Sequence, residues 1–225
     1  EKAMELFDQV IENFKRFHPK PEEVQCSDPQ SEPDFIKPYF GLRLFPVWHV
    51  GTDYLHEIGK NWYDYLVNKG VNFIWETKVD NIDFDKQIAS TTAWHGDVNE
   101  FTYNRLIFGV GKSGIDFGKQ LAEQYKLPTE PKSVQIGVRF EAPQKHFQKL
   151  IDISYDFKLY RKFEDKGVSL RSFCTNNNAA YVAAEHTYGD VSYNGHAKKD
   201  EKYRNDMTNF GILMEIQGID KPFDW

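Results

Sequence analysis

The sequence predicts a mixed α/β (α+β) protein in which a half made of helices and a β-meander is followed by a β-rich half. Apolar residues recur at helical spacing in a few segments of the first half, whereas short runs of two-residue alternation dominate the second half. The chain has 225 residues, of which 40% are hydrophobic and 16% aromatic. This composition supports one large or two small domains with an apolar core and excludes a disordered chain.

The first part of the chain, residues 1–40, is predicted to be a helix followed by a proline-rich linker. Residues 1–18 place one apolar stripe on a helical face, formed by Ala3, Phe7, Val10, Phe14 and Phe17. Residues 19–39 contain five prolines, which lack a backbone donor and fix φ, so we expect a loop. Because the chain begins without an initiator Met and stops just after the apolar run 212–216, we expect it to be an internal piece of a longer protein.

Residues 41–130 are predicted to form the first domain. After an extended stretch at 40–50, Thr52 is a suitable N-cap for a helix that Gly70 ends in a left-handed conformation. The buried stripe of this helix is expected to consist of Leu55, Ile58, Trp62 and Leu66. A strand is expected directly afterwards, at 71–75.

An antiparallel meander and a second strand–helix unit are expected to complete this domain. The meander strands are predicted at 79–84, 88–94 and 99–103, with polar turns between them. A buried strand at 106–108 then leads into the glycine run 109–114 and a helix.

Residues 131–225 are predicted to form the second, β-rich domain, because two prolines interrupt the pattern near 128–131. The clearest strand of the chain follows, where Val134, Ile136, Val138 and Phe140 alternate with polar residues and glycine. Residues 143–151 are expected to be helical. Further short strands are predicted at 168–175, 181–185, 191–193 and 210–216.

Composition excludes several classes of function. The net charge of −6, from 34 acidic and 28 basic residues, does not provide the basic surface of a nucleic-acid-binding protein. No apolar run has membrane-spanning length. The two cysteines, Cys26 and Cys174, are far apart and form no redox or metal motif, so a reducing cytoplasm is expected. The seven histidines include no helical pair with ligand spacing, and we expect no metal site.

The glycine run is the most specific local motif. Gly109, Gly111 and Gly114 match G-x-G-x-x-G between a predicted strand and a predicted helix, as in dinucleotide-binding turns. One interpretation is therefore a separate NAD(P) site in a nicotinamide-dependent reductase. The other is a plain strand-to-helix turn that Ser113 caps, with Asp116 as its capping-box partner.

Several segments, in the same order, resemble the FAD-dependent dehydrogenases of the two-dinucleotide-binding-domain flavoprotein superfamily. The resemblance covers most of the chain from about residue 40 onward. The segments that carry it are Trp48-His49-Val50-Gly51-Thr52-Asp53, Leu66-Val67-Asn68-Lys69-Gly70-Val71, Glu76-Thr77-Lys78-Val79-Asp80-Asn81-Ile82, Leu106-Ile107-Phe108-Gly109-Val110-Gly111-Lys112-Ser113, Ile136-Gly137-Val138-Arg139-Phe140-Glu141-Ala142-Pro143-Gln144, Ser172-Phe173-Cys174 and Ser192-Tyr193-Asn194-Gly195-His196.

This resemblance implies a partial, Rossmann-like FAD-binding domain followed by the start of a substrate domain. It implies that the backbone at Val79 lies near the adenine and that Gly109 and Gly111 lie at the edge of the cofactor. Candidate residues facing the catalytic site and a small-molecule substrate are Arg139, Glu141, Cys174 and Asn194.

The sequence departs from the family at two points. The N-terminal fingerprint that holds the FAD pyrophosphate is not in the chain, so we expect the isolated chain to lack tight FAD binding and to be inactive. A second cysteine expected after Cys174 is replaced by an asparagine run at 176–178, which argues against two-cysteine chemistry. A non-catalytic ligand-binding or partner-binding module therefore remains open beside the two enzyme classes.

Overall fold

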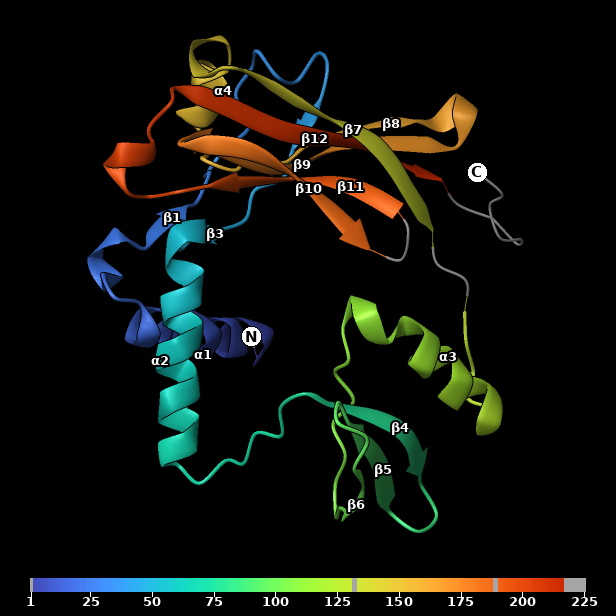
Figure 1. Ribbon diagram of the computed structural model, residues 1–225. Helices are drawn as coiled ribbons and strands as arrows, with labels where there is room; N and C mark the ends of the chain where they lie inside the picture. The colour runs from blue at the N-terminus through green and yellow to red at the C-terminus, as the bar shows by residue number, and fades with distance from the viewer. Residues whose placement is uncertain (1, 131–132, 188–189, 217–225) are drawn as a thin grey trace. The chain divides into compact units, whose positions relative to one another are not determined.

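The computed structural model describes residues 2–130, 133–187 and 190–216 (Figure 1). It contains helices and several antiparallel sheets, which confirms the mixed α/β class. Two compact units divide the chain: Glu1–Leu66 together with Lys132–Trp225, and Val67–Pro131. Residues 41–66, which the sequence groups with the first domain, thus belong to the same unit as the β-rich half.

A five-stranded antiparallel sheet organises the larger unit, in the order β2-β8-β9-β12-β7. Its strands are β2 Gly41–Leu42, β7 Val134–Pro143, β8 Leu159–Phe163, β9 Val168–Asn178 and β12 Met207–Ile216. The long register between β7 and β12 pairs Arg139 with Gly211 and Phe140 with Phe210. The strand predicted from residue 134 onward is therefore confirmed.

The apolar core of this unit lies on the face of the sheet that carries Phe210. Ile36, Leu42 and Phe157 are its buried centre. The ring of Phe210 contacts Phe157 and Phe147 edge-on, at centroid distances of 5.4 Å and 5.1 Å. The short helices η4 Gln144–His146 and α4 Gln148–Ile151, which confirm the predicted helical stretch, bring Phe147 to this core.

A two-stranded hairpin packs against the sheet. It consists of β10 Ala180–Thr187 and β11 Asp190–Ala197, and these strands contact β12, β9 and β7 (Figure 1). Since Arg139 neighbours Phe140 on β7, strand alternation directs its side chain to the face opposite the Phe210 core. Hydrogen bonds from Arg139 to Tyr193 and Cys174 agree with this placement.

The linker region adds a small second sheet to this unit. Strand β1, Gln25–Ser27, pairs antiparallel with β3, Val47–His49. The 3₁₀-helix η1, Pro21–Glu23, precedes β1. The proline-rich linker is therefore largely irregular, as predicted, but it contains one short strand that the prolines at either side conceal in the sequence.

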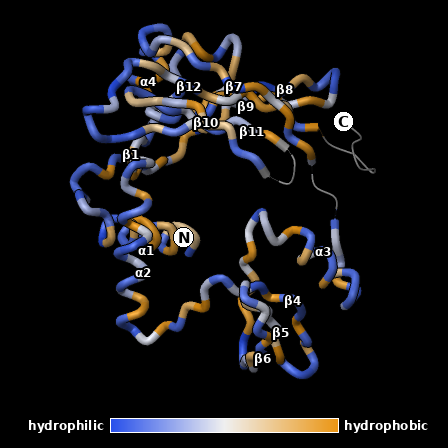
Figure 2. Tube along the Cα trace, viewed as in Figure 1, coloured by the Kyte–Doolittle hydropathy of each residue, from blue (hydrophilic) through white to orange (hydrophobic). Residues whose placement is uncertain are grey.

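Two helices pack together through aromatic side chains. They are α1 Lys2–Phe17 and α2 Leu55–Asn68, and the 3₁₀-helix η2 Thr52–Tyr54 precedes α2. Phe17 stacks on Trp62 of α2, with ring centroids 5.3 Å apart. Hydrophobic and hydrophilic stretches alternate along α2 in Figure 2, as an amphipathic helix requires. Of the predicted stripe Ile58 is buried, whereas Leu55 is exposed.

The smaller unit contains the predicted meander. Its strands are β4 Thr77–Asp83, β5 Ile88–Ala93 and β6 Val98–Thr102, in sequential antiparallel order. The helix α3, Ile115–Gln124, follows the 3₁₀-helix η3, Lys112–Gly114. Tyr125 at the end of α3 donates a hydrogen bond of 2.8 Å to the carbonyl of Ile82, which fixes α3 to β4.

Two strands predicted in the smaller unit are wrong. Residues 71–75 and 106–108 form no strand, and their side chains are largely solvent-exposed, with exposed fractions of 65% for Trp75 and 95% for Ile107. An apolar segment becomes a strand only when neighbouring strands satisfy its backbone donors and acceptors. Neither segment is part of the sheets or isolated β-bridges that the described residues form. The Rossmann-like sheet expected around them is therefore not formed by this part of the chain.

No helix among the described residues combines the length and apolarity needed to cross a membrane.

Candidate functional site

A cavity of about 690 Å³ lies on the face of the large sheet against which the β10–β11 hairpin packs. Its walls come from β7, β9 and β12 of the sheet and from both hairpin strands. Arg139 is the charged residue of this lining, and Asn194 enters it from the hairpin. The apolar part of the lining is formed by Val138, Phe173, Val182, Val191 and Leu213.

Arg139 is held in place by three neutral acceptors. Its Nη1 atom donates to the carbonyl oxygen of Cys174 at 3.1 Å and to Oδ1 of Asn209 at 2.9 Å. Its Nε atom donates to the carbonyl oxygen of Tyr193 at 3.3 Å. Burial lowers the pKa of Arg139 below its usual value, which Cys174 and Asp156 partly oppose. The guanidinium remains charged in spite of this shift.

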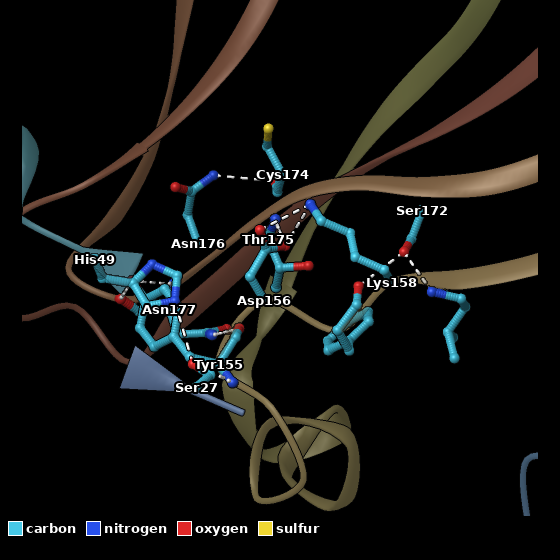
Figure 3. A network of polar contacts seen from close by, with 12 residues as sticks. Ser27, His49, Tyr155, Asp156, Lys158, Ser172, Cys174, Thr175, Asn176 and Asn177 are labelled. Atoms are coloured by element: carbon cyan, nitrogen blue, oxygen red, sulfur yellow. Dashed lines mark hydrogen bonds and ion pairs between the residues drawn. The ribbon is translucent and has the colours of Figure 1, made fainter. Parts of the chain in front are cut away.

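The backbone at Cys174 has the unusual conformation that directs its carbonyl toward Arg139. Its φ is 33°, in the left-handed region, and it lies where the pairing of β9 with β12 shifts register between Asn209 and Gly211. Such bulges redirect side chains locally. In Figure 3 the sulfur of Cys174 points away from the Asp156–Lys158 ion pair.

Asn194 is fixed by a carboxylate of the neighbouring strand. Its Nδ2 atom donates to Oε2 of Glu185 at 2.6 Å, and Glu185 also lies 3.8 Å from Nε2 of His196. The ring of His196 stacks on Tyr181 at 5.1 Å. The hairpin therefore positions the Asn194 amide at the cavity. The partners of the Glu185 carboxylate, Asn194 and His196, both belong to the hairpin.

The polar layer behind Arg139 contains a fully buried asparagine. Asn209 is 0% exposed, and its Oδ1 also accepts a hydrogen bond of 3.1 Å from Asn176. The Nδ2 atom of Asn209 has no hydrogen-bond partner among the described residues. A buried unpaired donor is destabilising. Its presence here favours a role for Asn209 in positioning Arg139.

Three of the four predicted catalytic candidates therefore meet in one place, and the fourth does not. Arg139 and Asn194 line the cavity, and the backbone carbonyl of Cys174 accepts a hydrogen bond from Arg139. Glu141 is exposed and does not line the cavity, although it lies on the same face of β7 as Arg139. Two residues along a strand are far enough apart to place its carboxylate beyond the cavity wall.

The predicted cofactor-binding residues all belong to the smaller unit. Val79 lies on β4 at a register shift of the β4–β5 pair. Gly109 and Gly111 lie in the turn before η3, and a Cβ atom at either would meet open space. The φ of 62° and ψ of −162° at Gly111 belong to a region that only glycine adopts readily. This turn therefore fits close approach of a ligand to its backbone.

The glycine turn lacks the context of a complete dinucleotide fingerprint. Residues 106–108 before it form no strand, whereas the fingerprint requires a strand, a turn and a helix. The N-cap of α3 is Gly114 and not the predicted Ser113. A Cβ at Gly114 would collide with the side chain of Val110, so this glycine serves local packing.

A second polar cluster, which sequence reasoning missed, lies on the larger unit (Figure 3). His49 packs against the ring of Tyr155 at 4.0 Å, and its Nε2 atom is 3.2 Å from Oγ of Ser27. Burial lowers the pKa of His49 to about 4. Asp156 pairs with Lys158 at 2.7 Å. The Asp-Phe-Lys sequence just before β8, in which the two charges are two residues apart, was the available signal.

Asp53 has a structural function that its position in a helical first turn conceals. Its carboxylate accepts hydrogen bonds from the backbone N–H groups of Lys199 and Asp200, at 3.0 Å and 3.1 Å. It thereby joins the segment before α2 to the chain that leaves β11. Burial lowers the pKa of Lys199, whose Nζ donates to Gln25 at 2.7 Å.

The described residues contain no group of three or more His, Cys, Asp or Glu side chains that could hold a metal ion. Both cysteines are free thiols. No protein-family model matches the chain, and the search of curated proteins finds no match. The family resemblance drawn from the sequence therefore stays a prediction.

Proposed function

We propose that this chain is part of a cytoplasmic FAD-dependent oxidoreductase that moves a hydride between a small substrate and the flavin. The observation that carries this proposal is a cavity lined by Arg139 and Asn194, in which the backbone carbonyl of Cys174 accepts a hydrogen bond from Arg139. The resemblance assigns these three residues to the substrate side of the flavin, although they come from three different strands. A cavity with an apolar wall and a few fixed polar groups is typical of a ligand site.

In this proposal the chain binds and orients the substrate. Arg139 and Asn194 would position its polar end, and the apolar wall would exclude water from the reacting carbon. By the resemblance, the backbone of Val79 would lie near the adenine, and the backbone of Gly109 and Gly111 would lie at the edge of the cofactor. FAD, when bound, would supply the redox chemistry by accepting a hydride from the substrate or donating one to it.

The two free thiols agree with a cytoplasmic location. Cys26 is exposed and Cys174 is partly exposed, and no disulfide joins them. Reduced thiols persist in the cytoplasm and rarely in secreted proteins of this size.

The experiment that tests the proposal is an absorbance spectrum of the protein purified from its complete reading frame. Visible flavin bands that a reductant bleaches are the expected result. A folded, colourless protein would refute the flavoenzyme, and titration with NADPH would then test the glycine turn as a nicotinamide site. A Gly111→Val variant is the control for that titration, because the φ of 62° disfavours any β-branched residue.

A further inference from the structure

The geometry points to a small carboxylate with an apolar body as the ligand of the Arg139 cavity. The carboxylate pairs with the guanidinium, and the apolar body packs on the wall formed by Phe173, Val182 and Leu213. This inference names the substrate class of the oxidoreductase. It rests on the proposed function only in calling the ligand a substrate. The binding itself depends only on residues of this chain.

The first argument is the unbalanced charge of Arg139. Its three hydrogen-bond acceptors are two carbonyl oxygens and one amide oxygen, all neutral. Within the described ranges no carboxylate forms an ion pair with it. Asp156, which influences it through space, is already paired with Lys158 at 2.7 Å. A half-buried cation without a counter-ion is costly, and an anionic ligand relieves that cost.

The second argument is the orientation of the guanidinium. Its Nε and Nη1 atoms are occupied by the protein, which fixes the plane of the group. Its Nη2 atom makes no hydrogen bond to any residue that the structure describes, so it retains donors for a ligand. A carboxylate oxygen can accept from this Nη2 atom, and charge-assisted hydrogen bonds to arginine are among the stronger polar contacts.

The third argument is the composition of the cavity wall. Arg139 is the sole charged side chain among the described residues that line it, and its other polar side chains, such as Asn194 and Ser192, are neutral. A single positive charge matches a carboxylate, whereas phosphate sites gather several cations or backbone N–H groups. A volume of about 690 Å³ is ample for a ring or branched chain beyond the carboxylate.

The test is calorimetric titration of the 225-residue chain with 3-phenylpropionate and, separately, with its neutral analogue 3-phenylpropionamide. The two probes share a shape and differ in charge. Saturable binding of the acid, with the amide at least about tenfold weaker, is the expected result. Equal affinities, or no binding of the acid, would overturn the inference.

Variants then assign the binding to Arg139. Arg139→Gln is expected to weaken the acid about ten- to hundredfold and to leave the amide unchanged. Arg161→Gln is the matched control, because Arg161 is an exposed arginine on β8 outside the cavity lining, and it should leave both affinities unchanged. Unaltered acid binding by Arg139→Gln would overturn the assignment.

The design separates the inference from the proposed function. Calorimetry needs no flavin, so failed binding by a protein that shows a flavin spectrum overturns the substrate class alone. Carboxylate binding by a protein whose complete form is colourless overturns the oxidoreductase alone. If circular dichroism shows that Arg139→Gln is unfolded, the comparison of acid with amide on the unaltered chain still decides the inference.

Discussion

Gly195 lies where the β10–β11 hairpin meets the side chains that hold Arg139. A Cβ atom at this position would collide with Asn209, Arg139 and Asn176. The missing side chain therefore allows the hairpin backbone to approach the buried polar layer. Its place in the Asn-Gly-His stretch gave no sign of this function, because the three residues that require it are remote in sequence.

Gly195→Ala is expected to destabilise the chain by about 1–3 kcal/mol, since the added methyl group must displace fixed polar side chains. Chemical denaturation measures the effect. Gly59→Ala is the matched control, because Gly59 is inside α2 and its Cβ would meet open space. Alanine favours a helix, so that control should be neutral or stabilising by up to about 1 kcal/mol. Similar effects from both substitutions would contradict the packing argument.

His49 makes folding stability depend on pH. Burial lowers its pKa from 6.5 to about 4 in the folded chain, an effect that Lys199 and Lys158 reinforce and Asp156 opposes. Between these two values the unfolded chain binds a proton at His49 that the folded chain does not. Acid therefore destabilises the fold over this window, and below about pH 4 the contribution stops growing.

The measurement is urea denaturation at about pH 7 and about pH 4.5 for the unaltered chain and for His49→Gln. The full shift corresponds to about 3 kcal/mol, and the partial exposure of the ring reduces the expected loss to about 2 kcal/mol. His49→Gln removes the titrating group. The stability that this variant loses between the two pH values should therefore be about 2 kcal/mol smaller than the loss of the unaltered chain. An equal fall in both proteins would show that other groups cause the acid effect.

At the scale of elements, the α1–α2 pair depends on one aromatic cluster. Phe17 is 6% exposed and contacts both Trp62 and Tyr65, each at 5.3 Å between ring centroids. The carbonyl of Phe17 also accepts a hydrogen bond of 2.9 Å from Asn61. The end of α1 is therefore attached to the middle of α2 by both stacking and a hydrogen bond.

Phe17→Ala is expected to destabilise the larger unit by about 3 kcal/mol, because it removes a buried ring and leaves a cavity. Thermal unfolding followed by circular dichroism measures the loss. Met4→Ala on the same helix is the control, since Met4 is 53% exposed and should change stability by less than about 0.5 kcal/mol. A loss of the same size at Met4 would contradict the argument that the buried ring of Phe17 causes the effect.

Periodicity predicted the elements that are stabilised locally and failed for those that need distant partners. The meander strands, α1 and β7 follow from local alternation and turns. The apolar runs 71–75 and 106–108 have the same composition as real strands, yet they join none of the sheets among the described residues. A segment forms a strand only when another strand pairs with it, and local sequence patterns do not reveal whether such a partner strand exists.

At the scale of the whole molecule, the candidate site is an outcome of topology. Arg139 contacts Cys174 and Asn209, which are 35 and 70 residues away in sequence. The sequence could name Arg139, Cys174 and Asn194 only because a family resemblance pointed to them. It could not exclude Glu141, because alternation gives the face of a strand and not the extent of a cavity.

The most direct test of the account is the absorbance spectrum of the protein from its complete reading frame, recorded with and without 3-phenylpropionate. The account predicts flavin bands that a reductant bleaches and that the acid shifts, with the shift lost in Arg139→Gln. A folded protein without flavin absorbance would contradict the central claim that Arg139, Cys174 and Asn194 belong to a flavoenzyme.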